Sequence, residues 1–111
     1  MQLELIDGKH MLTINDKPPV NNCRPSVDVL FSSVAKISHN NILSVIMTGM
    51  GRDGTNGVAQ LKNKGAISIV QDQFSSVVWG MPRSVFEAGT ADEVIPLEDI
   101  GQRINKIVLR K

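Results

Sequence analysis

The sequence lacks the residues on which several functional classes depend. Of its 111 residues only one is cysteine, and aromatic side chains make up 4%. Cys23 alone cannot form an intrachain disulfide, and it lies far in sequence from His10 and His39, so no spacing typical of a zinc site occurs. We therefore expect no metal ion, and we interpret Cys23 as a small, half-buried residue.

The charges are too balanced for a highly charged partner. Twelve Lys and Arg residues stand against 11 Asp and Glu residues, which gives a formal net charge of +1. Such a chain offers no basic face to a nucleic acid and no polybasic anchor to a membrane. No apolar run approaches the roughly 20 residues that span a bilayer, and the N-terminus has no targeting pattern. We expect a cytoplasmic protein of one domain that neither binds nucleic acid nor inserts into a membrane.

What the sequence does have is a regular hydrophobic pattern. Apolar residues alternate on both sides of an Asp-Gly pair at positions 7 and 8, which predicts a β-hairpin within residues 1–15. Proline and asparagine then interrupt residues 16–25, which predicts a loop. Beyond this loop, apolar residues recur with the 3.6-residue period of a helix that begins at Pro25 or Ser26.

The rest of the chain alternates strands with helices. Apolar or β-branched runs at 42–47, 66–71 and 93–96 predict three strands, the first of them covered on both faces. A helix is predicted after each strand. The first carries Val58, Ala59 and Leu61 and ends before Gly65, and the second carries Val85 and Phe86, begins at Pro82 and ends before Gly89. The third begins at about Leu97, and its inward face carries Ile100, Ile104, Ile107 and Val108. Such βαβ units predict an α/β fold with a doubly wound, mostly parallel, Rossmann-like sheet behind the N-terminal hairpin.

The glycine-rich segment directly after the first of these strands is the candidate site. Ligands of open parallel sheets bind beyond the carboxyl ends of the strands, where residues 48–54 place three glycines and Asp53. Glycines let backbone N–H groups approach a bound anion, and a carboxylate can orient a base. Two alternatives stay open. In the first, Asp53 serves only as the N-cap of the next helix. In the second, the spacing of Gly49, Gly51 and Gly54 marks a dinucleotide site, but the match is weak because these glycines do not follow the first strand of the fold.

Three longer segments point to one family. Residues 21–35 read NNCRPSVDVLFSSVA, residues 47–54 read MTGMGRDG, and residues 65–100 read GAISIVQDQFSSVVWGMPRSVFEAGTADEVIPLEDI. In this order they resemble the chemotaxis receptor methylesterases, the CheB family, and the similarity runs from about Gly8 to Ile104. The resemblance implies a serine hydrolase that needs no cofactor. It removes methyl groups from glutamate side chains on the cytoplasmic helices of methyl-accepting chemoreceptors and deamidates certain glutamines there.

The resemblance implies roles for two residues of the glycine-rich segment. Asp53 matches the acid of the family's Ser, His, Asp triad, which fixes the imidazole tautomer and stabilises the imidazolium. Met50 matches the position whose backbone N–H helps to bind the oxyanion. The family's serine, in a Ser-x-Gly-Gly turn, and its histidine both precede the hairpin, and neither His10 nor His39 matches the triad base. None of the serines in this chain precedes a Gly-Gly.

We therefore expect residues 1–111 to be the C-terminal portion of a CheB-type catalytic domain, inactive by itself. The alternative is a noncatalytic remnant that binds the receptor. A sheet that lacks its upstream strands would have an open edge, which predicts self-association. Two surface features have two interpretations each: the Trp79 segment lines a receptor groove or is a packed loop, and Arg52 and Arg83 meet acidic receptor surface or are merely solvated.

Overall fold

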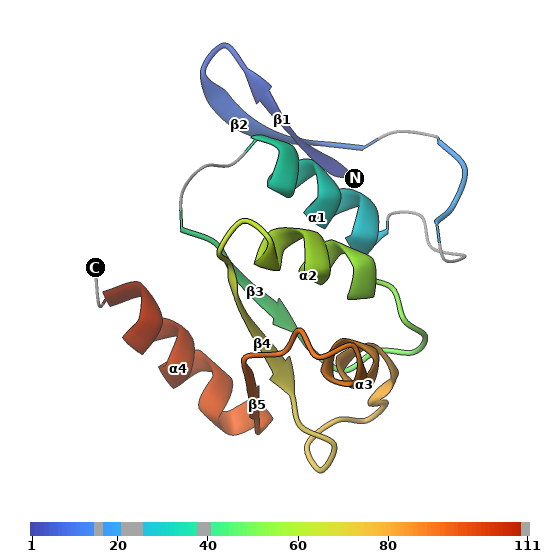
Figure 1. Cartoon of the computed structure of the whole chain (residues 1–111), viewed down its shortest axis with the longest axis vertical. Helices are drawn as coiled ribbons and strands as arrows, with labels where there is room; N and C mark the ends of the chain where they lie inside the picture. The colour runs from blue at the N-terminus through green and yellow to red at the C-terminus, as the bar shows by residue number, and fades with distance from the viewer. Residues whose placement is uncertain (15–16, 21–25, 38–40, 110–111) are drawn as a thin grey trace.

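The structure, a computed structural model, describes residues 1–14, 17–20, 26–37 and 41–109 (Figure 1). Strands and helices alternate within these ranges as the hydrophobic pattern predicts. The elements are β1 (Gln2–Ile6), β2 (Lys9–Thr13), α1 (Val27–Ile37), β3 (Leu43–Ile46), α2 (Thr55–Lys62), β4 (Ile67–Gln71), α3 (Gly80–Glu87), β5 (Glu93–Ile95) and α4 (Leu97–Leu109). The predictions for Cys23 and His39, and most of the predicted loop at 16–25, concern residues outside the described ranges.

The strands β3, β4 and β5 form a parallel sheet in that order. Ile46 pairs with Val70, and Val70 pairs with Val94. Helices α2 and α3 make the two connections, so each is a βαβ crossover, as parallel neighbours require. β3 is the outermost strand on its side of the described sheet. Self-association through this edge stays a prediction.

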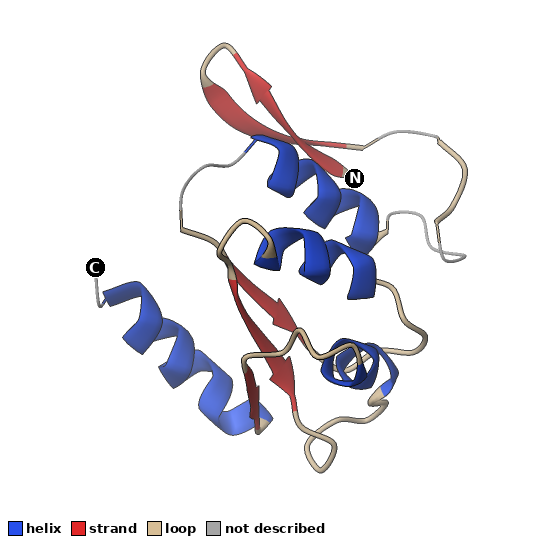
Figure 2. Ribbon diagram, viewed as in Figure 1, coloured by secondary structure: helices blue, strands red, loops and turns tan. Residues whose placement is uncertain are grey.

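Helices lie on both faces of the sheet, which confirms the doubly wound α/β class (Figure 2). On one face, Ile46 and Val70 pack with Val58 of α2 and Val85 of α3, and all four are buried. Helix α4 lies on the opposite face. Successive strand residues point to opposite faces, so each strand contributes to both layers.

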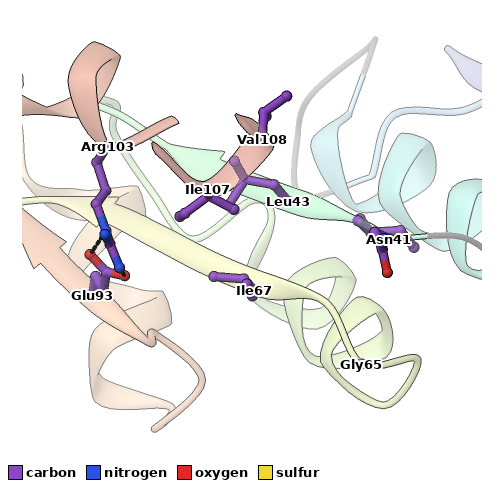
Figure 3. A pocket seen from close by; sticks show the side chains of 9 residues that line it. Asn41, Leu43, Gly65, Ile67, Glu93, Arg103, Ile107 and Val108 are labelled. Atoms are coloured by element: carbon purple, nitrogen blue, oxygen red, sulfur yellow. Dashed lines mark hydrogen bonds and ion pairs between the residues drawn. The ribbon is translucent and has the colours of Figure 1, made fainter. Parts of the chain in front are cut away.

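The face of the sheet beneath α4 is covered less completely than predicted. A groove of about 330 Å³ separates the end of α4 from the sheet (Figure 3). Ile100 is 4% exposed, but Val108, predicted to face inward, lines the groove and is 53% exposed. Leu43 of β3 also lines the groove and is only half-buried, so full cover of this strand on both faces is a wrong prediction. Arg103 of α4 donates two hydrogen bonds of 2.7 Å to Glu93, which attach the helix to β5.

The hairpin lies on α1 and not against the parallel sheet (Figure 1). Its turn has positive φ at Asp7 (50°) and Gly8 (78°), as the Asp-Gly pair predicts. The Ser33 hydroxyl on α1 accepts the Leu3 N–H at 2.7 Å. Helix α1 packs in turn along α2, where Phe31 contacts both hydrophobic clusters. The layers from the outside inward are therefore the hairpin, α1, α2 and the sheet.

One helix start differs from its prediction. Helices α2 and α3 end before Gly65 and Gly89, both with positive φ, as predicted. However, α3 begins at Gly80, two residues before the proline expected to open it. The third helical residue has no intrahelical acceptor for its N–H, so Pro82 fits there without loss of a hydrogen bond.

Asp92 ties the end of α2 to the residues just before β5. Its Oδ1 pairs with Lys62 Nζ at 2.5 Å, and its Oδ2 accepts the backbone N–H of Ser68 at 2.8 Å. The hydrogen bond from Lys62, followed by the one from Ser68, holds the pKa of the Asp92 carboxyl below its ordinary value. The folded chain therefore stabilises the ionised carboxylate.

The substitution Asp92→Asn should lower the free energy of unfolding at pH 7 by about 1 kcal/mol or less, because both partners are more than a third exposed and solvent screens the pair. The pKa is lower in the folded state. The stabilisation is therefore complete above the unfolded pKa and disappears as the pH falls through the folded one, below about pH 4. Urea unfolding of both proteins from pH 7 to pH 3 checks this. A difference that kept its size in acid would contradict it.

Candidate active site

Two loops meet at the carboxyl end of the sheet. They are the β3–α2 loop, residues 47–54, and the β4–α3 loop, residues 72–79. The Gly49 N–H donates to the carbonyl of Val78 at 2.8 Å, and the Met81 N–H donates to the carbonyl of Gly49 at 2.9 Å. The two loops therefore form one continuous surface, at the place where open parallel sheets bind their ligands.

Gly80 permits the close approach of these loops. A β carbon at this position would lie 2.9 Å from the Gly51 nitrogen and 3.0 Å from the Gly49 oxygen. Both are backbone atoms, which cannot rotate away as a flexible side chain could. Gly54, at the end of the β3–α2 loop, has a φ of 101°, a conformation that favours glycine. Loop contact and turn geometry thus account for the glycine pattern without a dinucleotide.

The Asp53 carboxylate caps α1 and not α2. It is 4% exposed and accepts the Ser26 hydroxyl at 2.7 Å, the Val27 N–H at 2.6 Å and the Asp28 N–H at 3.2 Å. These donors belong to the start of α1, where unpaired N–H groups and the helix dipole favour an anion. Gly54 occupies the N-cap position of α2, with no side-chain cap. The alternative that Asp53 caps the next helix is therefore wrong.

Helix α1 caps α2 in return. Asp28, in the first turn of α1, accepts the Gly57 N–H of α2 at 2.7 Å through its Oδ1. Ser26 and Asp28 are both buried, at 4% and 6% exposure. Neither residue was predicted to belong to the site. In the sequence, Ser26 and Asp28 are side chains of a capping type at the predicted start of a helix. Nothing in that pattern indicates that their partners lie in another segment.

Met50, in the same loop as this acid, has a backbone N–H without an acceptor among the described residues. Its side chain is 81% exposed. The N–H group is available to a ligand. The position fits the oxyanion role that the family resemblance implies, which stays a prediction.

The other predicted surface residues do not converge on Asp53. The Trp79 indole N–H donates to the carbonyl of Gln71 at 2.8 Å, and its ring centroid lies 6.0 Å from that of Phe86, which favours the packed-loop interpretation. Arg83 pairs with Glu87 on exposed α3 surface. His10 is exposed on β2, in the hairpin on the outer side of α1.

Two kinds of feature are absent from the described part of the chain. None of its helices combines the length and apolar character needed to cross a membrane. No group of three or more histidine, cysteine, aspartate or glutamate side chains there is arranged to hold a metal ion.

Comparison with known proteins gives one consistent result. A family model described as CheB methylesterase matches residues 1–104. The protein-glutamate methylesterase/protein-glutamine glutaminase of Trichodesmium erythraeum is 51% identical over 87 residues, which are 78% of this chain and 25% of that protein. The protein of the same name from Pyrococcus horikoshii is 40% identical over 108 residues, 97% of this chain and 29% of that protein.

A solved structure agrees with these relatives. The Thermotoga maritima CheB methylesterase catalytic domain matches with a TM-score of 0.90 and 37% identity, over 96% of this chain and 56% of that one. The chain therefore spans about a quarter to a third of the curated relatives and somewhat more than half of the solved domain.

Proposed function

The chain belongs to the CheB methylesterase family, and from this we propose that residues 1–111 form the C-terminal portion of a protein-glutamate methylesterase and glutamine deamidase domain. Its substrates would be glutamate methyl esters and certain glutamines on the cytoplasmic helices of chemoreceptors. One observation carries the proposal: a buried carboxylate, Asp53, is held by a helix N-terminus in the same loop as the open N–H of Met50.

Each residue has a defined role in the proposed acyl transfer. A serine from outside this chain attacks the γ-ester carbonyl carbon while a histidine, also from outside, takes the serine proton. Asp53 orients that imidazole and stabilises the imidazolium. The negative charge on the tetrahedral intermediate accepts the Met50 N–H. The bond to methoxide then breaks, the histidine returns the proton, and methanol leaves. Water repeats these steps on the acyl-enzyme and releases glutamate and the serine.

The surface around the loops supports a helical protein substrate. Three apolar side chains on the two loops are almost fully exposed: Met50 at 81%, Phe74 at 101% and Val77 at 92%. Exposed large apolar side chains on loops at the carboxyl end of a sheet are typical of an interaction site. Arg52, in the same loop as Met50, is also exposed and offers a positive charge to an acidic receptor surface.

The test compares the chain alone with a joined protein. In the joined protein, the part of the T. maritima domain that this chain does not match is fused in front of this chain; the match covers 56% of that domain. By the family resemblance, the fused part supplies the serine and the histidine. The joined protein should release methanol from methylated receptor and react with a fluorophosphonate probe at one serine. The chain alone should do neither.

Two outcomes would overturn the proposal. Stoichiometric labelling of the chain alone would show that its own serine is the nucleophile. A folded joined protein that binds receptor but releases no methanol would favour the noncatalytic alternative.

A further inference from the structure

Gln71 is a buried polar side chain at the carboxyl end of β4, and it is 1% exposed. We infer that Gln71 is a positioning residue: its amide fixes the backbone that leads to Met50 and so aims the Met50 N–H at the substrate. This inference rests on the proposed function, because it concerns the same oxyanion site. It adds a residue that the family motifs of the glycine-rich segment do not contain.

The Gln71 amide joins the two loops through both of its ends. Its Oε1 accepts the Thr48 N–H at 2.8 Å. Its Nε2 donates to the carbonyl of Ser75 at 2.7 Å and to the Ser75 Oγ at 3.2 Å. A flipped amide would place its NH₂ group against the Thr48 N–H and its oxygen against the Ser75 carbonyl, so this network defines one orientation.

Several hydrogen bonds hold the backbone before Met50, and the one from the Thr48 N–H is partly buried. The Thr48 hydroxyl exchanges hydrogen bonds with the backbone of Val78, at 3.0 Å as donor and 2.9 Å as acceptor, and Gly49 donates to the same Val78 carbonyl. Those contacts join the two loops to each other. Gln71 instead ties Thr48 to the central strand of the described sheet. It is therefore the side-chain contact that fixes Thr48 relative to the sheet.

Burial makes this contact hard to replace. The Gln71 end of the contact is 1% exposed, and its hydrogen bond to the Thr48 N–H is partly buried. Water is therefore a poorer substitute for the Gln71 oxygen than it would be on an open surface. Glutamate at position 71 would place an oxygen, and at neutral pH a charge, against the Ser75 carbonyl. Asparagine is shorter by one methylene and cannot reach both loops. Methionine keeps the volume of glutamine and removes both sets of hydrogen bonds.

The first experiment uses the chain alone and compares Gln71→Met with a matched control, Ser68→Ala. Ser68 is also a buried polar residue of β4, 1% exposed, and it lies near the opposite end of the strand. Its hydroxyl donates a hydrogen bond to the carbonyl of Thr90. Amide proton NMR should show Thr48 exchange faster by tenfold or more in Gln71→Met, with the Thr48, Gly49 and Met50 shifts displaced. The control should leave these three amides in place.

Trp79 reports whether the strand end survives the substitution. It is the sole tryptophan, and its indole donates to the backbone carbonyl of residue 71, which the substitution keeps. Emission from Trp79 should stay as in the parent chain. Unchanged loop amides in a folded Gln71→Met chain, or equal changes in the Ser68→Ala chain, would overturn the inference.

The second experiment measures turnover in the joined protein. Gln71→Met should lower kcat by about 10- to 100-fold and leave KM within about twofold, because the oxyanion contact exists only in the transition state. Ser68→Ala should change neither. Loop amides that move without any change in kcat would overturn the positioning role. A joined protein that is inactive before any substitution would refute the proposed function instead, and the amide measurements would still decide whether Gln71 sets the loop.

Discussion

Asp53→Asn should lower the free energy of unfolding of the chain by about 1–3 kcal/mol. The Asp53 carboxylate offers one oxygen to Ser26 and Asp28 and the other to the Val27 N–H. An amide keeps only one acceptor oxygen, so its NH₂ group must face a backbone donor in a site that is 4% exposed. It also removes the negative charge that the start of α1 stabilises. Urea unfolding of the two chains at pH 7 measures the difference.

The control is Asp99→Asn, which removes a carboxylate from the first turn of α4 at an exposed position. It should change the stability by no more than about 0.5 kcal/mol, since surface changes of this kind are small. An equal loss in both variants would mean that charge at a helix N-terminus, and not the buried network, explains the effect of Asp53.

The same substitution should reduce turnover of the joined protein by a factor on the order of 10²–10⁴, because an amide at this position favours the wrong imidazole tautomer. Methanol release is measured at a temperature where both proteins are folded, so that the loss of stability does not enter. Activity near that of the parent would leave Asp53 as a structural cap of α1 and would remove it from the proposed triad.

Gly57→Ala should destabilise the chain by about 2 kcal/mol, although alanine is the better helix former. A β carbon at Gly57 would lie 2.6 Å from the Cβ of Phe31, so α1 and α2 would have to move apart. Such overpacking costs up to about 3 kcal/mol, and the gain in helix propensity returns about 1 kcal/mol. Thermal or urea unfolding monitored by circular dichroism gives the value.

Gly101→Ala is the matched control within α4. A β carbon there would meet no atom within 4 Å, so only the propensity gain remains. This variant should be more stable by about 0.5–1 kcal/mol. If Gly57→Ala were also stabilising, the close contact between α1 and α2 would not limit the size of this residue.

Local patterns were sufficient to predict the elements of this fold. The alternation around Asp7 and Gly8 predicts the hairpin, and the apolar runs at 42–47 and 66–71 predict the parallel strands. A regular backbone that is buried on one side makes apolar residues recur at a fixed spacing, and a short stretch of sequence is enough to show that spacing. Val108 shows the limit of this reasoning. Its spacing places it on the apolar face of α4, but whether that face meets a sheet depends on how far the sheet extends.

The candidate site was predictable only in part. Its place after β3 follows from a general property of parallel sheets, and Met50 and Asp53 entered through family resemblance. The three hydrogen-bond donors to Asp53 lie 25 to 27 residues earlier in the sequence. The rule that a residue just before a helix caps that helix therefore assigned the carboxylate to the wrong helix. Gln71 reads as the polar end of a strand, and only the tertiary structure shows that both ends of its amide are used.

The exchange of caps between α1 and α2 makes their starts one cooperative unit. A local cap forms with its own helix, whereas each cap here forms only after the intervening chain has closed a loop, at an entropic cost. Neither helix start is complete without the other, so the two open together. An opening confined to this unit would release Asp53 while the sheet stays folded. The orientation of the acid and the integrity of the sheet are therefore governed by different free energies.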